Sequence, residues 1–354
     1  MADARDPAVR KVLGMVAPGT ALREGIERVI RANRGALIVL GWTAELEPLV
    51  SGGFVIDIAA TSQRVSELAK MDGSMVMDAD ASRILRANVH LVPDPTISTS
   101  ETGTRHRSAE RTARQTGLPV IAVSESMGMV NIYIGEQKYV VDEVTALLFR
   151  ANQALSTLER YRARLDEVSA MLSAREVEDA VALRDAVLTL QRAEMLRRIA
   201  HEVEEYVIEL GSQGRLIQLQ LDELVATVAD ERELVVRDYL GDRRRKLAKV
   251  LADLAALSTD ELLNAEKVAS VLSYDADQLD KPLTPRGYRL LSRIPRLPQA
   301  VVERLVERFG TFPAVMEASL AALDEVEGVG ESRARHIQDG LRRLAEATLL
   351  ERYV

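Results

Sequence analysis

The segment of this sequence that is best equipped to bind an anion is Gly103-Thr104-Arg105-His106-Arg107-Ser108. Two guanidinium groups flank an imidazole, with two hydroxyls and a glycine beside them. Arginine pairs with phosphate oxygens through two parallel hydrogen bonds, and histidine can donate a further one. The glycine lets a ligand approach the backbone closely. These groups suit a triphosphate, and a solvated basic loop is the plain alternative.

A second candidate for chemistry is Asp72-Gly73-Ser74, at the entry to the apolar run Met75-Val76-Met77. Taken alone, Asp-Gly in this position is a turn signal. An aspartate held rigidly where a strand begins can also bind a divalent metal and help to activate a hydroxyl. The glycine beside it would admit the ligand. Both interpretations are open at this stage.

A third candidate is the turn Gly328-Val329-Gly330, which is followed by Arg333 at the start of a new helix. Such a turn exposes backbone amides that can hold a DNA phosphate without reading the base sequence. The upstream segment 294–298 resembles a degenerate first copy of the same hairpin. It lacks both glycines, which argues against a phosphate contact there. An ordinary helical pair used for packing is the alternative.

The elements that must position the first two candidates are strands and helices in the segment before residue 145. Short apolar runs bounded by turn residues predict strands, and Gly135-Glu136 predicts a hairpin. The segment 108–117 is predicted to be a short helix closed by its glycine, so that the Arg-His-Arg cluster lies at a helix N-terminus, where anions are favoured. The predicted strands are 37–40, 75–77, 120–123, 131–134 and 137–141.

From residue 146 to about 280 the pattern becomes helical, because apolar residues recur at helical spacing among Glu and Arg. This stripe predicts the packing surface of long spacer helices; it comprises Leu155, Leu158, Tyr161, Leu165, Val168 and Leu172. The sequence therefore predicts three domains. They are an α/β domain over 1–145, an all-α spacer over 146–280 and an all-α hairpin domain over 281–354.

The composition excludes several classes of function. The 354 residues include no cysteine, which excludes disulfides and cysteine-bound zinc, and the four histidines show no metal-ligand spacing. The net charge of −8 means that any DNA binding must come from a local surface. We find no clustered carboxylates of the kind a nuclease needs. No apolar run approaches the length of a membrane span, and the start resembles no secretory signal, so we expect a cytoplasmic protein with no membrane partner.

Four motifs together resemble the diadenylate cyclase family. They are Asp72-Gly73-Ser74, the stretch 87–93, the segment 103–108 and Val123-Ser124-Glu125-Ser126. With a helical spacer and a terminal helix-hairpin-helix, the whole chain is similar to the DNA integrity scanning members of that family. One departure is that the usual Asp-Gly-Ala of the family reads Asp-Gly-Ser here, which adds a hydroxyl near the ligand.

The resemblance implies an enzyme that condenses two ATP molecules into cyclic di-AMP and releases two pyrophosphates. It implies an α/β cyclase domain with a mixed sheet and flanking helices. Asp72 would bind Mg²⁺ or Mn²⁺ and assist deprotonation of the attacking hydroxyl, while Arg105, His106 and Arg107 would grip the phosphates. The remaining ATP-binding residues by match to the family are Gly73, Ser74, Leu91, Thr104, Ser108, Ser124 and Glu125.

The chemistry of that reaction also constrains the assembly. Each ATP must offer its 3′-hydroxyl to the α-phosphate of the other, so two identical half-sites have to face one another. The resemblance further implies an octamer and a C-terminal domain that binds branched DNA through residues 328–330 and Arg333, and we expect such binding to lower the cyclase activity. The alternative is a DNA-binding scaffold or repair accessory protein with an inactive nucleotide-binding domain.

Overall fold

The computed structural model describes residues 6–242 and 244–351, so the outermost ends of the first and third predicted domains, 1–5 and 352–354, lie outside the described residues. The chain divides into two compact units. One runs up to Gln153 and includes Glu202–Leu219, and the other comprises Ala154–His201 and the chain from Gln220 onward. The boundaries of the three predicted domains stay a prediction, because the spacer helices supply residues to both units.

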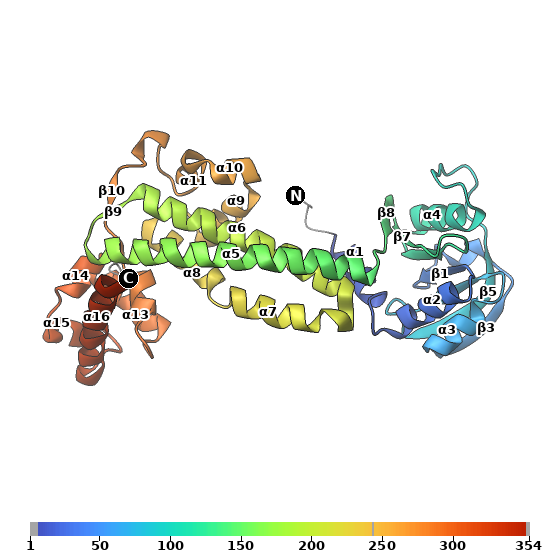
Figure 1. Cartoon of the computed structure of the whole chain (residues 1–354), viewed down its shortest axis with the longest axis horizontal. Helices are drawn as coiled ribbons and strands as arrows, with labels where there is room; N and C mark the ends of the chain where they lie inside the picture. Colours follow the sequence, from blue (N-terminus) through green and yellow to red (C-terminus); the bar gives the residue numbers. More distant parts are fainter. Residues whose placement is uncertain (1–5, 243, 352–354) are drawn as a thin grey trace. The chain divides into compact units, whose positions relative to one another are not determined.

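The first unit is built on a mixed eight-stranded sheet in the order β2-β5-β4-β1-β6-β7-β8, with β3 paired to β5 (Figure 1). The pair β1 and β4 is parallel, and the other pairs are antiparallel. The strands are β1 (Ala36–Leu40), β2 (Val50–Ser51), β3 (Phe54–Ala59), β4 (Ser74–Met77), β5 (Arg83–Leu91), β6 (Val120–Val123), β7 (Val130–Ile134) and β8 (Gln137–Val140). The mixed sheet of the sequence prediction is confirmed.

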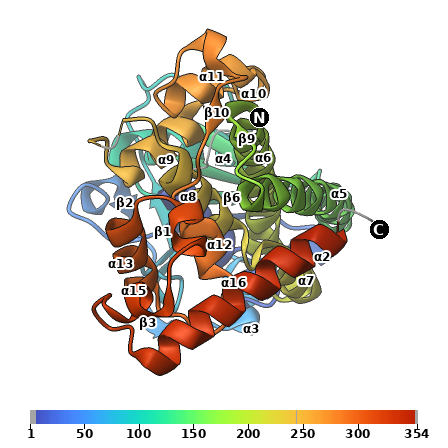
Figure 2. The same cartoon turned by 90° about the vertical axis from the view of Figure 1, so that its left-hand side faces the viewer.

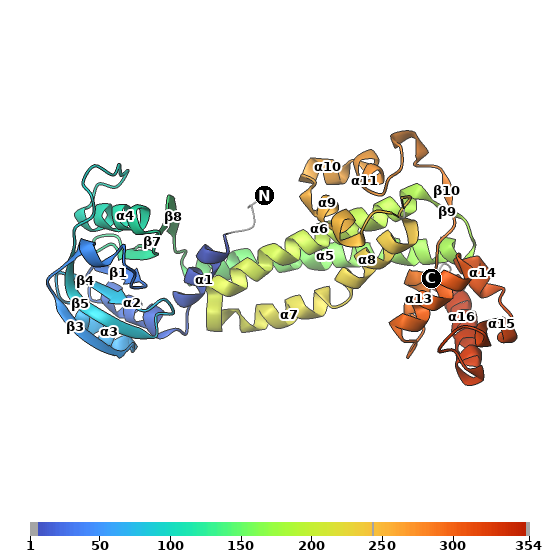
Figure 3. The same ribbon diagram turned by 180° about the vertical axis from the view of Figure 1, so that it is seen from behind.

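Helices cover both faces of this sheet, as Figure 3 shows from behind. They are α1 (Pro7–Met15), α2 (Ala21–Arg31), α3 (Ser62–Leu68) and α4 (Thr104–Thr116), with a 3₁₀ turn η1 (Glu47–Leu49). Successive side chains of a strand point to opposite faces. Accordingly Ala36, Ile38 and Leu40 share a core with α1, α2 and α3, whereas Leu37 and Val39 share one with α4. This arrangement explains why β1 is buried and apolar at every position.

The helix that carries the Arg-His-Arg cluster begins earlier than predicted. The sequence places its start at Ser108, but α4 begins at Thr104 with Gly103 as its N-cap. The backbone N–H of Arg107 donates to the carbonyl of Gly103 over 2.9 Å, which closes the first turn. The cluster therefore lies inside the first turn of the helix. The C-terminal end is as predicted, since Gly117 ends the helix in the left-handed conformation with φ of 71°.

The second unit is helical apart from a two-stranded ladder. The predicted apolar stripe lies on α5, where Leu158, Leu165 and Leu172 are buried. The elements are α5 (Val144–Val177), α6 (Leu183–Leu210) and α7 (Arg215–Val225), which belong to both units, with η2 (Gly211–Gly214) of the first unit between α6 and α7. They are followed by α8 (Val228–Tyr239), α9 (Leu247–Ala256), α10 (Thr259–Leu263), α11 (Ala265–Val271), η3 (Ala276–Gln278), α12 (Tyr288–Ser292), α13 (Gln299–Phe309), α14 (Phe312–Met316), α15 (Leu320–Asp324) and α16 (Glu331–Glu351), and β9 (Val181–Ala182) pairs with β10 (Pro282–Leu283).

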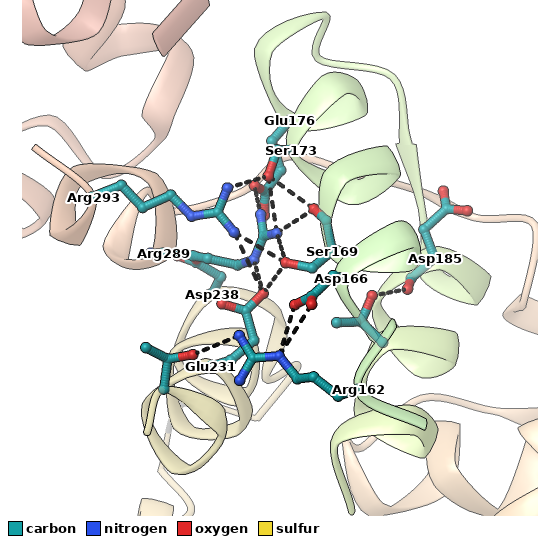
Figure 4. Close-up of polar contacts among 12 residues, drawn as sticks. Arg162, Asp166, Ser169, Ser173, Glu176, Asp185, Glu231, Asp238, Arg289 and Arg293 are labelled. Carbon is teal, nitrogen blue, oxygen red and sulfur yellow. Dashed lines mark hydrogen bonds and ion pairs between the residues drawn. The ribbon is translucent and has the colours of Figure 1, made fainter. Parts of the chain in front are cut away.

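A buried arginine joins α12 to the spacer helices α5 and α8 (Figure 4). Arg289 is fully buried, and its guanidinium donates from Nε to Glu231 over 2.7 Å and from Nη1 to the buried Glu176. Its Nη2 donates to the hydroxyls of Ser169 and Ser173, over 2.7 and 2.9 Å. Since each of the three guanidinium nitrogens has a partner, the cluster satisfies the requirement that a buried charge be paired and hydrogen-bonded.

A carboxylate from α8 caps α12 at the same place. Asp238 is buried and accepts the backbone N–H groups of Gly287, Tyr288 and Arg289 over 2.8, 2.8 and 2.9 Å. These are amides at a helix start, which have no partner within their own helix. Burial and the neighbouring Glu176 nevertheless raise the pKa of Asp238 to about 7, against the pull of the three amides. The start of the last segment is thus fixed to the spacer by both side chain and backbone.

Among the helices of the described ranges, none combines the length and the hydropathy that a bilayer span requires.

Candidate active site

The predicted phosphate-binding and metal-binding motifs meet at one cavity of the first unit. Its volume is about 940 Å³, within the range of small-molecule sites, and it is lined from β4, β5, the first turn of α4 and the loop after β6. The predicted residues that line it are Asp72, Gly73, Ser74, Leu91, Thr104, Arg105, His106, Ser108, Ser124 and Glu125. Segments that are far apart in the sequence are therefore brought together as predicted.

Arg107 is the predicted phosphate ligand that the cavity does not include. Its side chain is exposed, although it lies in the same helical turn as Arg105 and His106. Because α4 starts at Thr104, successive residues of the first turn point about 100° apart around the helix axis. Thr104, Arg105, His106 and Ser108 line the cavity, and Arg107 points away from it. The two arginines of the motif therefore occupy different environments.

The Asp-Gly pair is shaped by a close approach of two strands. A Cβ at position 73 would lie 2.5 Å from the carbonyl carbon of Asn88 on β5, so glycine is required at this point. Asn88 itself has φ of 52°, a left-handed conformation that asparagine tolerates better than most residues. The tight contact holds the exposed carboxylate of Asp72 at the mouth of the cavity, where β4 begins.

Ser74, which replaces the alanine usual in the family, has a structural partner. Its side chain is buried, and its hydroxyl donates to the backbone carbonyl of Val89 over 2.9 Å. The extra hydroxyl that the sequence places near the ligand therefore donates its hydrogen bond to β5. Its presence is compatible with the geometry of the site.

Arg105 reaches the cavity through space left by a glycine before β1. A Cβ at Gly35 would overlap the guanidinium of Arg105 and come within 2.9 Å of the carbonyl oxygen of Val123. The same guanidinium lies 3.9 Å from the exposed carboxylate of Glu125. Arg105 is therefore aimed into the cavity from a fixed position, with an acidic neighbour from the loop after β6.

His106 is half-buried between the cavity and β7. Its Nδ1 lies 3.0 Å from the hydroxyl of Tyr133 and 3.2 Å from the side-chain amide of Asn131. Burial lowers the pKa of His106 below its ordinary value of 6.5, while the charge of Glu101 opposes this shift. Tyr133, Asn131 and Glu101 were not among the sequence candidates. The signal for Asn131 was a polar residue on an inward-facing position of an apolar strand.

Further residues of the cavity wall were also missed by the sequence analysis. Asn33 has φ of 51° in the loop before β1, and His90 follows the strained Asn88 by two positions on β5. His90 lies in the stretch 87–93 that contributes to the family resemblance, but it was not singled out as a ligand, whereas Asn33 lies in none of the motifs. The lining residues that were not named as ATP ligands are Asn33, Leu37, Val89, His90, Gly103 and Ser126.

The residues present fit a magnesium-like ion that is held jointly with a nucleotide. Within residues 6–242 and 244–351, no three carboxylate or imidazole side chains gather as a ready-made metal site. Mg²⁺ characteristically takes one or two carboxylates and completes its coordination with phosphate oxygens and water. Asp72 at the cavity mouth supplies one such carboxylate. A divalent ion is therefore compatible with this site once a triphosphate is present.

The C-terminal segment contains two helical pairs, α12 with α13 and α15 with α16 (Figure 2), whose turns each have a positive φ at the corresponding position. The first links α12 to α13 and the second links α15 to α16. Arg296 in the first has φ of 60°, and Gly328 in the second has φ of 83°. In each turn the next N–H donates to the carbonyl three residues earlier, over 3.3 and 2.8 Å. The copy that looks degenerate in sequence thus retains the fold, although Pro298 brings no N–H where the second copy has Gly330.

The second hairpin is braced by two arginines. Arg304 of α13 donates to the carbonyl of Glu327 over 2.9 Å, and Arg333 donates to the carbonyl of Gly328. Val329 is buried and anchors the turn to the core of this segment. Residues 328–330 therefore form the turn, Arg333 of α16 contacts it, and Val329 can offer a ligand its backbone but not its side chain.

The similarity to known proteins extends over nearly the whole chain. Residues 23–138 match the family model described as DisA bacterial checkpoint controller nucleotide-binding, and residues 141–280 match the DisA bacterial checkpoint controller linker region. A DNA integrity scanning protein DisA of Acidothermus cellulolyticus is 56% identical over 99% of this chain and 96% of its own length. Proteins of the same name from Parafrankia sp. and Streptomyces coelicolor are 54% and 53% identical over 99% of this chain, and over 98% and 95% of their own lengths.

Proposed function

This chain belongs to the DisA family and is a diadenylate cyclase, and from that premise we propose that it condenses two ATP molecules into cyclic di-AMP across a symmetric interface between facing subunits. The observation that carries the proposal is the single cavity that unites Asp72 with the first turn of α4. This transfer needs a carboxylate that assists deprotonation of the attacking hydroxyl and cationic groups that offset the charge of the phosphates.

The roles that we propose follow from the lining of the cavity. Arg105 and His106 bind the triphosphate, together with the amides at the start of α4, and favour departure of pyrophosphate. Thr104 and Ser108 assist there. Leu91 and Ser124 lie beside the adenine and the ribose. Gly73 leaves room for the nucleotide, and Glu125 lies near its phosphates. These two residues complete the site that we propose.

We assign Asp72 two tasks in this proposal. It holds the divalent ion, Mg²⁺ or Mn²⁺, and it assists removal of the proton from the attacking 3′-hydroxyl. The ion, when bound, would offset the negative charge at the α-phosphate. The exposed position of Asp72 at the cavity mouth supports this role, because the attacking hydroxyl belongs to the ATP of the opposite half-site.

Two half-sites must face one another for both bonds of the cyclic product to form. The exposed Arg107 suits this arrangement, since a cation outside its own cavity can contact the nucleotide of the facing subunit. We propose an octamer as the complete assembly, by analogy with the family. The facing pair is the part of the assembly that the chemistry requires.

The direct test is incubation of the purified chain with ATP and either Mg²⁺ or Mn²⁺, with chromatographic analysis of the products. We expect cyclic di-AMP from the parent, and none from Asp72→Asn or from the Arg105→Ala/Arg107→Ala double variant. If the parent forms no product with either ion while it still binds DNA, the scaffold alternative replaces this proposal.

We further propose that the C-terminal domain binds branched DNA through its second hairpin and that this binding lowers cyclase activity. The backbone amides of residues 328–330, at the start of α16, would hold a phosphate, with Arg333 supporting the turn. The first hairpin shares the positive φ of the second at the corresponding position, but its Pro298 offers no N–H to a phosphate, so the proposed contact lies at the second hairpin.

Gly328→Ala tests the hairpin with a close control. A Cβ at Gly328 would meet Arg304 at 2.6 Å, and the residue has φ of 83°. Gly310→Ala is the control, because Gly310 has a similar φ of 77° but lies outside the hairpin, and an added Cβ would meet nothing within 4 Å. We expect Gly328→Ala to weaken junction binding, measured by anisotropy, and Gly310→Ala to retain it. Turnover that does not change when junction DNA saturates the parent would contradict the proposed regulation.

A further inference from the structure

A chain of hydrogen bonds runs from His106 away from the cavity. The hydroxyl of Tyr133 on β7 donates to a carboxylate oxygen of Glu101 over 2.9 Å. Lys138 on β8 donates to the same oxygen over 2.5 Å. A tyrosine hydroxyl has one proton to donate. Because Glu101 takes it, the Tyr133 oxygen can act toward His106 only as an acceptor.

Two contacts of Nδ1 place the proton on the imidazole of His106. Nδ1 lies 3.0 Å from the Tyr133 oxygen and 3.2 Å from the side-chain amide of Asn131, whose buried Oδ1 has no other partner. With that amide turned so that Oδ1 faces the ring, both neighbours are acceptors, and Nδ1 carries a hydrogen and donates it. The second nitrogen, Nε2, is then the one available to a ligand in the cavity, which His106 lines. In the neutral ring Nε2 carries a lone pair, whereas a triphosphate needs a donor. A proton on Nε2 makes the ring a cation with a donor at each nitrogen.

We propose that Glu101 and Tyr133 are positioning residues that hold His106 in one tautomer and stabilise its protonated form, so that Nε2 donates to the triphosphate of ATP. The inference rests on the proposed function, because it assigns His106 to the phosphates. The Nε2–H bond forms when ATP binds, with a proton from hydronium or a buffer acid, whose own bond to that proton breaks.

The surroundings of His106 explain why such support is needed. Burial lowers its pKa, and Lys138 and Arg105 act in the same direction, while Glu101 acts against them. Although burial opposes it, Lys138 and Tyr133 lower the pKa of Glu101, so that its carboxylate stays charged. The groups that face the ring are Glu101 before α4, Arg105 on α4, Asn131 and Tyr133 on β7, and Lys138 on β8.

Tyr133→Phe is the decisive variant, because it removes one oxygen and keeps the buried ring. Tyr139→Phe on the next strand is the matched control, since its hydroxyl donates to Gln137 and lies outside the cavity lining. We expect kcat/KM for ATP to fall about 10- to 100-fold in Tyr133→Phe, the usual range for losing a hydrogen bond to a charged group. Tyr139→Phe should match the parent.

A double-mutant cycle with His106→Ala separates positioning from a general effect on the fold. If Tyr133 acts through His106, Tyr133→Phe will cost nothing further in the His106→Ala background. An equal loss in both backgrounds would overturn the proposal, as would unchanged kcat/KM in the single variant. Glu101→Gln provides a second arm should Tyr133→Phe unfold; it keeps an acceptor but removes the charge, and we expect a smaller loss in the same direction.

Proton uptake gives a readout that does not depend on turnover. Calorimetry of 3′-deoxyATP binding, in buffers of different ionisation enthalpy and above the ordinary pKa of histidine, counts the protons taken up. We expect uptake by the parent, less by Tyr133→Phe and Glu101→Gln, and none by His106→Ala. Equal uptake by all four would overturn the inference. A parent that takes up the proton but makes no cyclic di-AMP would refute the proposed function while leaving the positioning of His106 intact.

Discussion

Arg105 owes its place in the cavity to the side chain that Gly35 lacks. We predict that Gly35→Ala displaces the guanidinium, because the added Cβ would overlap it. The KM for ATP should rise about tenfold or more, in line with the loss of a charge-assisted contact. Steady-state kinetics measures this effect. Gly14→Ala is the control: its Cβ would meet Ile208 at an ordinary 3.8 Å, and neither residue lines the cavity. Unchanged KM in Gly35→Ala would show that Arg105 does not bind ATP from this position.

Ser74 offers a second test at the scale of one side chain. Its buried hydroxyl donates to the carbonyl of Val89, so Ser74→Ala removes a hydrogen bond between β4 and β5. We predict a decrease of about 1 kcal/mol in the free energy of unfolding, the typical net value of such a bond. Chemical denaturation measures it. A variant as stable as the parent would show that the hydroxyl does not contribute to the strand pairing.

Residue types and spacing predicted the charged members of the cavity and several of its other motif residues. They could not predict Tyr133, Glu101 or Gly35, because these act through partners that are distant in sequence. Nor could they show that Arg107 points elsewhere, since this depends on where α4 begins. Side-chain direction follows from the exact start of a helix, which is the least certain feature of a sequence pattern.

At the scale of elements, the apolar strands β1, β4, β6 and β7 were predicted within one residue at each end. The strands β3 and β5 were not. Both carry polar residues in their interiors, and their pairing has register shifts at bulges, so neither shows a clean alternation. The irregularity of β5 is tied to the site, because its end lines the cavity.

The link between α12 and the spacer helices depends on a buried charge. We predict that Arg289→Met costs about 3–5 kcal/mol of unfolding free energy, the usual result of removing one partner of a buried pair. Glu176 would be left without its counter-charge. Arg289→Met/Glu176→Gln should recover part of the loss, since the double variant leaves fewer unpaired charges. Denaturant unfolding of both variants measures the difference; equal stability of the two would argue against the pairing.

The capping carboxylate of α12 gives a pH dependence of known sign. The pKa of Asp238 is raised from 3.8 to about 7, so the folded state holds the proton more tightly than the unfolded state. Its contribution to stability is complete below the lower value and is lost as the pH rises through the higher one. We predict that the melting temperature of the parent falls relative to that of Asp238→Asn across this interval. Parallel curves in calorimetry would contradict the assignment.

At the scale of the whole molecule, activity should depend on association. A chain whose product needs two facing half-sites has no cyclase activity alone. We predict that cyclic di-AMP formed per chain decreases on dilution, in step with the loss of oligomers seen by mass photometry at the same concentrations. Constant activity per chain at concentrations where single chains predominate would contradict the facing arrangement.

The buried contacts of Arg289 and Asp238 also determine where this protein can be cut. A fragment beginning near residue 281, as composition alone suggests, would carry Arg289 away from Glu176 and Glu231 and leave the first amides of α12 without their acceptor. Such a truncation would expose Arg289, which is buried in the intact chain, and would destabilise the start of α12 in the first hairpin. The smallest fragment that contains the hairpins and keeps these contacts is therefore one that retains α8 and the C-terminal half of α5.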